Sequence, residues 1–378
     1  MKKVVSIVLN NFKNDSRVLK EAITLQNGGY DIKVVALHEE PLKEFDTISN
    51  ILVHRIKVKS KEWSKRRFIQ LIKYFEFIYR TVKEYRDVDT LHCNDLNTLP
   101  IGVIIKKFFN KNAKIVYDAH EYEINDRPNE GKYSIKIKYF FEKRLIKYAD
   151  KVITVSDAIA NEYVKLYNIE KPSLVLNTPP FQDIEKKDIF RETFDIKKEQ
   201  IIFLYQGGLS RGRGIEILLD TFKELSSEEN QAVILFMGYG SLEEEIQINV
   251  KQYTNIYFHK AVTPDVLLDY TSSADFGIST IEDSCLSYRY CLPNKMFEYL
   301  MADIPVIVSN LYEMKSFVEK NKVGVVLKEN SSEGLKKGIE KAITLNKEVL
   351  QKNIERVKEV YNWEEQEKIF LNVYEGLV

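Results

Sequence analysis

One short segment of the sequence combines glycine and arginine in a pattern that could bind phosphate. The segment YQGGLSRGRG, residues 205–214, follows the apolar run IIFL and precedes IEILLDTFKEL, whose apolar residues recur at helical spacing. We therefore expect a helix to begin near Gly214, with its amide-rich, dipole-positive end facing an anion, most simply a phosphate. No Lys-Ser or Lys-Thr follows, which excludes a Walker loop, and the glycines do not fit G-x-G-x-x-G. The candidate ligands are Gly207, Gly208, Arg211 and Arg213.

Two further segments of the second half could contribute to the same site. The run MGYGSLEEEI follows an apolar strand and places Gly238 and Gly240 in a second glycine turn before a helix. The run SYRYCLPNKMFEYLMADIPVIVS places a Pro-Asn-Lys turn before a helix that carries Glu298. Glu298 could instead be an exposed residue paired with Lys295, and the arginines of the first segment could be solvated loop residues.

Polar side chains in the first half follow apolar runs. The segments LHCNDLNTLP and IVYDAHEYE place five of them at or just past two strand ends, namely His92, Asp95, Asp118, His120 and Glu121. Histidine and carboxylate groups in such positions are candidates for hydrogen bonding to a ligand or for acid–base chemistry. Each has a structural alternative, because His120 could satisfy a buried polar contact and Asp95 could be a turn residue.

Strands and helices must alternate to position these residues. Apolar runs occupy residues 3–9, 30–37, 89–93, 113–120, 151–156 and 172–177, and then 200–208, 232–238, 256–260, 274–279, 304–309 and 324–327. Helical patterns lie between them, and unbroken Val/Ile runs suit parallel sheets covered on both faces. The sequence predicts an α/β protein of two Rossmann-like, doubly wound domains facing across a cleft.

A proline-rich, charged segment marks the predicted domain boundary. LNTPPFQDIEKKD interrupts the periodicity, so we expect domains at residues 1–178 and 179–361. The last helical pattern, about residues 362–378, would return to brace the first domain. A cleft between two such domains is the default ligand site. Arg17 is a candidate for that cleft, although Asp15 and Ser16 before it first indicate helix capping.

Length and composition place the protein in a broad class. The chain has 378 residues, of which 44% are hydrophobic and 30% charged, which suits two globular domains. No apolar run approaches the roughly 18 residues of a membrane-spanning helix, and MKKVVSIVLN predicts a first strand and not a signal peptide. The three cysteines have neither metal-binding spacing nor a disulfide framework, so we expect a cytoplasmic location.

Charge is distributed unevenly along the neutral chain. Residues 1–180 hold 32 Lys and Arg against 23 Asp and Glu. Residues 61–86 and 132–148 are amphipathic and basic, and the first has a broad apolar stripe formed by Phe68, Leu71, Ile72, Phe75, Ile78, Tyr79 and Val82. The pattern favours core-packed helices with a solvated basic face. The alternative is peripheral docking on an anionic membrane surface. Nucleic acid is not expected as a partner, because no recognised binding module is present.

In this order, the segments resemble the GT-B glycosyltransferases of family 4 over nearly the whole chain. In that family the second domain begins with a loop of the form G-(G/R)-L-x-x-x-(K/R)-G, which GGLSRGRG matches. MGYGSLEEEI, SSADFGIST and PNKMFEYLMADIPVIVS match later motifs of that domain. NDSRVLKEAITLQNGGYDIKVVAL, HCNDLNTLP, YDAHE and VSDAIANEYVKLYNI fit the acceptor domain of one branch.

The resemblance implies a reaction and assigns roles to residues. The enzyme would move a sugar from a UDP- or GDP-linked nucleotide sugar to a saccharide or lipid-linked acceptor, with retention of configuration and without a metal. Arg213 and the two glycine turns would stabilise the departing diphosphate, which preorganised amides and a guanidinium suit. Lys295 would lie close to the donor and Glu298 would bind the ribose. The acceptor side would hold His120 near the transferred sugar, with Arg17, His92, Asp95 and Glu121.

One position departs from the family pattern. Many members carry a glutamate eight residues before the one matched by Glu298, and here that residue is Tyr290. The hexose contact would then be absent, or fall to Glu282 or to backbone amides around Ser284–Ser287, and retention is left open.

The sequence thus predicts a cytoplasmic glycosyltransferase of bacterial surface polysaccharide or glycolipid synthesis. Two alternatives stay open. A nucleotide-sugar 2-epimerase would share the fold but need no acceptor, and a catalytically silent scaffold would only bind the nucleotide.

Overall fold

The computed structural model describes residues 2–13, 15–64, 66–226 and 231–377. The chain forms two compact units. Unit 1 comprises Met1–Asp126, Glu130–Val175 and Glu367–Val378, and unit 2 comprises Arg127–Asn129 and Leu176–Gln366. Within the described residues, no helix is both long enough and apolar enough to cross a membrane.

Unit 1 is built on an eight-stranded sheet with the order β3-β4-β2-β1-β5-β6-β7-β8. All its strand pairs are parallel except β3 with β4. The strands are β1 (Lys3–Ile7), β2 (Asp31–Leu37), β3 (Phe45–Ile48), β4 (Ile51–Ile56), β5 (Thr90–Asn94), β6 (Lys114–Ala119), β7 (Lys151–Thr154) and β8 (Ser173–Leu174). Leaving aside the β3 edge, the order in chain sequence is 3-2-1-4-5-6-7, so the winding reverses between β1 and β5.

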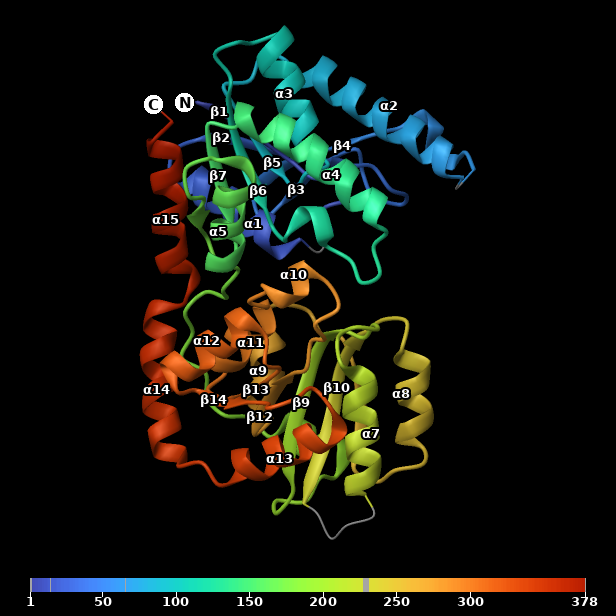
Figure 1. Ribbon diagram of the computed structural model, residues 1–378, viewed down its shortest axis with the longest axis vertical. Helices are drawn as coiled ribbons and strands as arrows, with labels where there is room; N and C mark the ends of the chain where they lie inside the picture. The colour runs from blue at the N-terminus through green and yellow to red at the C-terminus, as the bar shows by residue number, and fades with distance from the viewer. Residues whose placement is uncertain (1, 14, 65, 227–230, 378) are drawn as a thin grey trace. The chain divides into compact units, whose positions relative to one another are not determined.

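Helices connect and cover these strands (Figure 1). They are α1 (Ser16–Asn27), η1 (Lys59–Glu62), α2 (Arg67–Tyr85), α3 (Leu99–Phe108), η2 (Glu123–Asn125), α4 (Lys132–Leu145), η3 (Ile146–Tyr148), α5 (Asp157–Tyr167) and the last part of α15 (Trp363–Glu375). α1 begins where the sequence indicated, because the Asp15 carboxylate accepts a hydrogen bond from the Val18 amide at 3.2 Å. α15 is tied to α1 by Thr24, whose hydroxyl lies 3.1 Å from the Glu367 carboxylate.

The sequence did not predict the β3–β4 hairpin. Its two-residue turn is Ser49 and Asn50, both with positive φ (47° and 66°), a geometry that matches the twist of a tight hairpin. β3 lies at the sheet edge and has no buried residue, so it lacks the apolar run that marked the other strands.

Unit 2 is built on a six-stranded, fully parallel sheet with the order β11-β10-β9-β12-β13-β14. The strands are β9 (Ile201–Gly208), β10 (Ala232–Tyr239), β11 (Ile256–Lys260), β12 (Phe276–Ser279), β13 (Val306–Val308) and β14 (Gly324–Val326). In chain sequence this is the order 3-2-1-4-5-6, so the winding reverses between β9 and β12.

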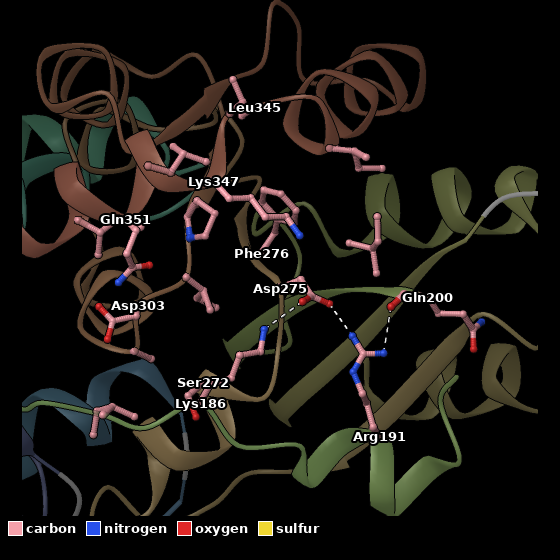
Figure 2. A pocket seen from close by; sticks show the side chains of 18 of the residues that line it. Lys186, Arg191, Gln200, Ser272, Asp275, Phe276, Asp303, Leu345, Lys347 and Gln351 are labelled. Carbon is pink, nitrogen blue, oxygen red and sulfur yellow. Dashed lines mark hydrogen bonds and ion pairs between the residues drawn. The ribbon is translucent and has the colours of Figure 1, made fainter. Parts of the chain in front are cut away.

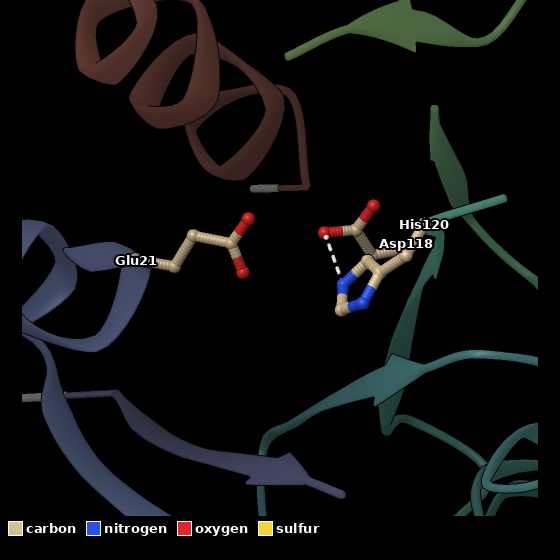
Figure 3. Close-up of side chains that lie close together, drawn as sticks. All are labelled: Glu21, Asp118 and His120. Carbon is tan, nitrogen blue, oxygen red and sulfur yellow. Dashed lines mark ion pairs between the residues drawn. The ribbon is translucent and has the colours of Figure 1, made fainter. Parts of the chain in front are cut away.

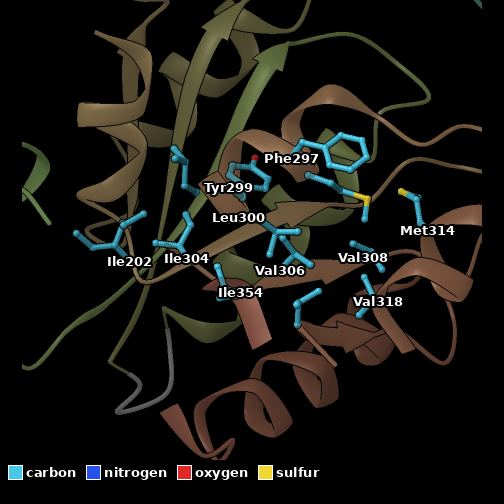
Figure 4. Close-up of a cluster of buried hydrophobic side chains, with 14 of the residues drawn as sticks. Ile202, Phe297, Tyr299, Leu300, Ile304, Val306, Val308, Met314, Val318 and Ile354 are labelled. Carbon is cyan, nitrogen blue, oxygen red and sulfur yellow. The ribbon is translucent and has the colours of Figure 1, made fainter. Parts of the chain in front are cut away.

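Two helical layers cover the sheet of unit 2. One apolar layer packs α7 (Ile215–Leu225), α8 (Glu243–Val250) and α13 (Ser332–Ile343) onto one face. Figure 4 shows the layer on the other face, where Phe297, Leu300 and Met314 pack against Val306 and Val308. It joins α6 (Ile189–Phe194), α11 (Asn294–Met301), α12 (Tyr312–Asn321) and α14 (Lys347–Val360), and α9 (Leu267–Ser272) and α10 (Leu286–Arg289) complete the unit. The predicted α/β class and both doubly wound sheets are confirmed.

Candidate functional site

The glycine segment of unit 2 forms the turn from β9 to α7, and α7 begins immediately after Gly214 as predicted. Gly214 has φ 79°, and a Cβ there would lie 2.1 Å from the carbonyl oxygen of Thr280. No other residue fits that position without moving the backbone. The ends of β9 and β10 also approach closely, since a Cβ on Gly238 would lie 1.9 Å from the Gly207 carbonyl oxygen. The glycines thus build a compact, amide-lined edge at the carboxyl ends of the strands.

Two cations lie at this edge without a counter-ion. Within the described residues, neither Arg213 nor Lys295 forms an ion pair. The Arg213 guanidinium instead lies over the Tyr288 ring, 4.6 Å from its centre. The Lys295 ammonium is buried 3.6 Å from the centre of the Tyr205 ring and has no hydrogen-bond partner there.

Burial, together with the Arg213 charge, lowers the pKa of Lys295 to about 7. A buried lysine beside a second cation is disfavoured as an ammonium until an anion arrives. Lys295 also faces the glycine turn, because a Cβ on Gly207 would lie 3.7 Å from the Lys295 Nζ. This edge of unit 2 is therefore suited to binding a negatively charged group.

Glu298 is held at the same edge by a residue that the sequence analysis missed. The Gln206 side-chain amide donates a 2.6 Å hydrogen bond to the Glu298 carboxylate and accepts one from the Thr271 hydroxyl at 2.8 Å. The backbone amide of Gln206 donates to the Tyr299 hydroxyl at 2.9 Å. Glu298 is half-buried and does not pair with Lys295 as an exposed surface residue would.

The other candidates of unit 2 are placed less centrally. The Arg211 side chain is 87% exposed and lies 3.9 Å from Glu216. The Glu282 carboxylate accepts a hydrogen bond from the Gly214 amide, and burial raises the pKa of this half-buried side chain. A carboxylate thus already faces the amide just before α7, where the sequence predicted a phosphate. Ser284 and Gly240 are exposed.

Unit 1 contains a buried cluster of charged groups centred on Asp118, at the end of β6. Arg17, in the first turn of α1, reaches Asp118 through two nitrogens at 2.9–3.2 Å and lies 3.0 Å from Glu21. Its third nitrogen donates to the Val175 carbonyl oxygen at 2.9 Å. Burial would raise the pKa of Asp118, but Arg17 and His120 hold it well below the usual range. Arg17 therefore holds β6 and α1 together.

His120 lies between two carboxylates. Its Nε2 is 3.3 Å from Asp118 and its Nδ1 is 3.4 Å from Asp95, which adopts a left-handed conformation (φ 63°) after β5. Burial lowers the pKa of His120, but Asp95 and Asp118 together raise it to about 10. The ring is an imidazolium at neutral pH, and it is suited to donating hydrogen bonds rather than to accepting a proton.

His92 is not available to a ligand. The ring is 1% exposed, and its Nδ1 lies 2.7 Å from the hydroxyl of Tyr374 on α15. Burial lowers its pKa, which favours the neutral imidazole. The expectation of an acceptor-side role for His92 is not supported by this position, because β5 points the ring into the packing of α15. Glu121 is exposed.

Three side chains of unit 1 could each offer one ligand atom to a metal ion. Those atoms of Glu21, Asp118 and His120 all lie within 4.8 Å of one another (Figure 3). Arg17 already lies against both acidic groups, however, at 3.0 Å from Glu21 and 2.9 Å from Asp118, and His120 is itself cationic. Burial, together with Asp118, raises the pKa of Glu21 to about 8 although Arg17 lowers it, which disfavours the charged form of this group. A divalent ion prefers charged, uncompensated carboxylates, and this donor set does not fit one.

A pocket of about 630 Å³ lies in unit 2 away from the glycine turns. Its lining includes Ile201 and Phe276, the first residues of β9 and β12, whereas the glycine turns follow the ends of β9 and β10. Figure 2 shows two of its cations, Lys186 and Arg191, bound to Asp275, and the distances are 3.0 and 2.8 Å. The other two cations of the lining, Lys198 and Lys347, are exposed, so the pocket offers no buried equivalent of the Arg213–Lys295 pair.

The sequence analysis missed Glu21, Gln206, Tyr288 and Tyr374. The i, i+4 spacing of Arg17 and Glu21 could have indicated that the two side chains pair. Gln206 directly precedes the glycine turn, and its position could have indicated a role. Tyr374 lies 282 residues from His92 in the chain, and no local pattern reports such a contact.

Comparisons with known proteins identify related families and relatives. The family model described as Glycosyltransferase Family 4 matches residues 16–177, and the one described as Glycosyl transferases group 1 matches residues 186–360. The uncharacterized glycosyltransferase MJ1069 of Methanocaldococcus jannaschii is 24% identical over 81% of this chain and 79% of its own. A second protein of that organism, the uncharacterized glycosyltransferase MJ1607, is 22% identical over 93% and 90%.

Solved structures share the fold at low sequence identity. Sucrose-phosphate synthase from Thermosynechococcus elongatus superposes with a TM-score of 0.82 at 16% identity, covering 100% of this chain and 99% of that one. HepE of Anabaena, solved in complex with UDP-glucose, superposes with a TM-score of 0.75 at 14% identity, again covering 100% and 99%.

Proposed function

The chain belongs to the glycosyltransferases of the GT-B fold, with a family 4 and a group 1 domain, and on that premise we propose that unit 2 binds the diphosphate of a nucleotide sugar and unit 1 the acceptor. The observation that carries the proposal is the pair Arg213 and Lys295. Both are basic, neither forms an ion pair within the described residues, and both lie at the glycine-lined edge of the unit 2 sheet.

These groups would act on the leaving group. Departure of the sugar places negative charge on the diphosphate, and preorganised amides with two cations stabilise that charge without reorganisation. A guanidinium can bind two phosphate oxygens at once, while Lys295 supplies a point charge from the buried side. Glu298, oriented by Gln206, would accept hydrogen bonds from the ribose hydroxyls. No step of this scheme requires a metal ion.

UDP is the first nucleotide to test. HepE, which has the same fold, was solved with UDP-glucose, with UDP, and with UDP and glucose. GDP is the alternative, because none of the residues described above selects the base. We propose retention of configuration from the resemblance to the family. The residues add no support of their own, because Tyr290 stands where many related enzymes carry a glutamate.

The unit 1 cluster would position the acceptor or the transferred sugar. His120 is cationic and half-buried, so its ring would donate a hydrogen bond to a hydroxyl oxygen. It would not serve as the general base, since its proton is stabilised by Asp95 and Asp118. A saccharide or lipid-linked acceptor in surface polysaccharide or glycolipid synthesis would supply such hydroxyls, with the enzyme working in the cytoplasm.

The first test is calorimetric binding of UDP and GDP to the wild type, to Arg213→Ala and to Arg356→Ala. Arg356 is an exposed arginine of α14 and serves as the matched control. We expect one nucleotide to bind, Arg213→Ala to weaken binding by about tenfold or more (about 1.4 kcal/mol), and the control to leave it unchanged. Binding that is unaffected by Arg213→Ala would remove this residue from the diphosphate site.

A product assay then separates the proposed transfer from the other activities that share this fold. The protein is incubated with UDP-sugars, with and without saccharide and lipid-linked acceptors, and the products are identified by NMR. Transfer requires an acceptor and gives a new glycoside. A new nucleotide sugar formed without acceptor would instead indicate an epimerase, and nucleotide binding without any product would indicate a scaffold.

A further inference from the structure

Helix α2 exposes a stripe of large apolar side chains. Phe68, Leu71, Phe75 and Tyr79 recur every three to four residues and are 71%, 52%, 61% and 66% exposed. The buried residues of this helix all lie in its C-terminal half, from Phe77 onward. The expectation of a core-packed helix is therefore wrong for the N-terminal half of α2, which extends beyond the packed surface and leaves its apolar side uncovered.

Helix α4 carries a second stripe of the same kind. Tyr133, Ile137, Phe140 and Phe141 are 84%, 56%, 48% and 53% exposed and again follow helical spacing. Between the two helices lies α3, whose C-terminal end adds the exposed Phe108 and Phe109. Figure 1 shows α2, α3 and α4 next to one another within unit 1. We call the exposed apolar residues of these three helices the aromatic patch.

Basic side chains flank the patch. Lys132, Lys136, Lys143, Arg144 and Lys147 lie on α4 and η3, and none of them forms an ion pair within the described residues. Three of them lie over aromatic rings: Lys143 over Tyr139 at 5.2 Å, Arg144 over Phe140 at 3.9 Å and Lys147 over Tyr148 at 5.4 Å. The only acid within residues 132–148, Glu142, is 0% exposed and accepts hydrogen bonds from buried tyrosines, so these two helices offer no exposed carboxylate of their own to offset this charge.

We propose that the aromatic patch docks unit 1 on the surface of an anionic lipid bilayer. Aromatic and aliphatic side chains flanked by Lys and Arg are suited to a bilayer interface, where the rings enter the headgroup region and the cations meet lipid phosphates. Water disfavours so many exposed rings on three adjacent helices, and patches of this kind mark interaction sites. The excess of positive charge selects anionic lipid over a second copy of this patch, which would repel it.

This inference is independent of the reaction, since it can be tested by binding alone. Vesicles of phosphatidylcholine with 30–40% phosphatidylglycerol are sedimented with the protein, and pure phosphatidylcholine vesicles serve as the reference. We expect binding to the anionic vesicles only, weakened by salt, because the electrostatic part is screened within about 10 Å at 0.1 M salt.

Two sets of variants separate the apolar and the charged contributions. The apolar set is Phe75→Ser, Tyr133→Ser and Ile137→Ser, and the charge set is Lys132→Gln, Lys136→Gln and Lys143→Gln. Each lysine removed should lower the partition coefficient about fivefold. The matched controls lie in unit 2: the exposed Ile248→Ser, Val349→Ser and Val360→Ser for the first set, and Lys251→Gln, Lys320→Gln and Lys352→Gln for the second. Nucleotide binding and the thermal midpoint verify that each variant is folded.

The chain carries its own fluorescent reporter. It has two tryptophans, of which Trp363 is 6% exposed and Trp63 is 55% exposed. The Trp63 carbonyl oxygen accepts a 3.0 Å hydrogen bond from Lys73 of α2, which places it beside the patch. Docking should shift Trp63 emission to shorter wavelength on anionic vesicles, and Trp63→Phe should remove the shift.

Loss of vesicle binding in both patch sets, with the unit 2 controls unchanged, would support the inference. Equal binding of patch and control variants would overturn it, as would no binding by the wild type. A wild-type dimer that the apolar set converts to monomer, without any vesicle binding, would also overturn it and would assign the patch to a second copy of the chain. Nucleotide binding is measured separately, so failure here leaves the proposed reaction standing.

Discussion

Lys295 should take up a proton when a nucleotide sugar binds. In the free protein its ammonium is buried, has no hydrogen-bond partner within the described residues, and lies near the Arg213 charge, so its pKa falls to about 7. A diphosphate beside it supplies the missing negative charge. That charge should raise the pKa back toward the ordinary value of about 10.4.

The size of the effect follows from the two pKa values. Binding is favoured by protonation, because the bound state has the higher pKa. At about pH 8, about nine-tenths of Lys295 is neutral in the free protein, so binding should take up about 0.9 proton. The dissociation constant should then rise about 25-fold between about pH 6.5 and 8.5, and change little below about pH 6.

The assay is calorimetry of a UDP-sugar in buffers that differ in ionisation enthalpy, since the buffer-dependent part of the heat counts protons. A nucleotide sugar is preferable to free UDP because both of its phosphates are diesters and do not titrate in this range. Lys295→Met, which keeps the length of the side chain and removes its charge, should abolish both the proton uptake and the pH dependence. Arg213→Ala should raise the pKa of Lys295 and shift the onset of pH dependence upward.

Two results would refute the reasoning. The first is a wild-type protein that binds the sugar nucleotide with no proton uptake at about pH 8. The second is a Lys295→Met variant with the same uptake as the wild type, which would place the titrating group elsewhere.

Two further predictions concern unit 1. Asp95→Asn should lower the pKa of His120 from about 10 toward the neutral range, because Asp95 and Asp118 together raise it and only Asp118 would remain, and the histidine NMR signals followed against pH would report it; an unchanged His120 titration would show that Asp118 alone holds the proton. Glu142→Leu should lower the free energy of unfolding by about 3 kcal/mol or more, since Tyr117 and Tyr163 donate to this carboxylate at 2.6 and 2.8 Å and would be left buried without an acceptor. Urea unfolding would measure it, with the half-buried Glu162 of α5 as the control position, and equal effects at Glu142 and Glu162 would contradict the prediction.

Much of the fold could be predicted because its signals are local. Strands such as β9 and β10 are unbroken apolar runs, and a parallel strand covered on both faces needs no alternation. Asp15 and Gly214 mark helix starts through their own side chain or backbone. The β3–β4 hairpin was missed because an edge strand without buried residues has no such run.

The sequence predicted which residues form the candidate site better than it predicted the charge states of these residues. The positions of Arg213, Lys295 and Glu298 follow from local motifs, and the structure brings them to one sheet edge. Their charge states do not follow from the sequence. The pKa of Lys295 is lowered by burial beside Tyr205. The pKa of His120 is raised by two carboxylates, each of which follows or ends a different strand. The burial of His92 could not be predicted either, because it depends on contact with Tyr374 of α15, at the other end of the chain.

The distribution of charge partners explains why the two units would hold different ligands. In unit 1, Arg17 binds Asp118 and His120 lies between Asp118 and Asp95, so each cation already has its anion. Such a cluster presents oriented hydrogen-bond donors and acceptors with little unbalanced charge, which suits the neutral hydroxyls of a sugar. In the part of unit 2 that the structure describes, Arg213 and Lys295 form no ion pair, and burial beside the Arg213 charge lowers the pKa of Lys295. An incoming anion would stabilise the ammonium form, and a diphosphate brings two negative charges to that edge. On the proposed function, the protein would separate a site that requires charge from one that requires hydrogen-bond geometry, as transfer from a charged donor to a neutral acceptor demands.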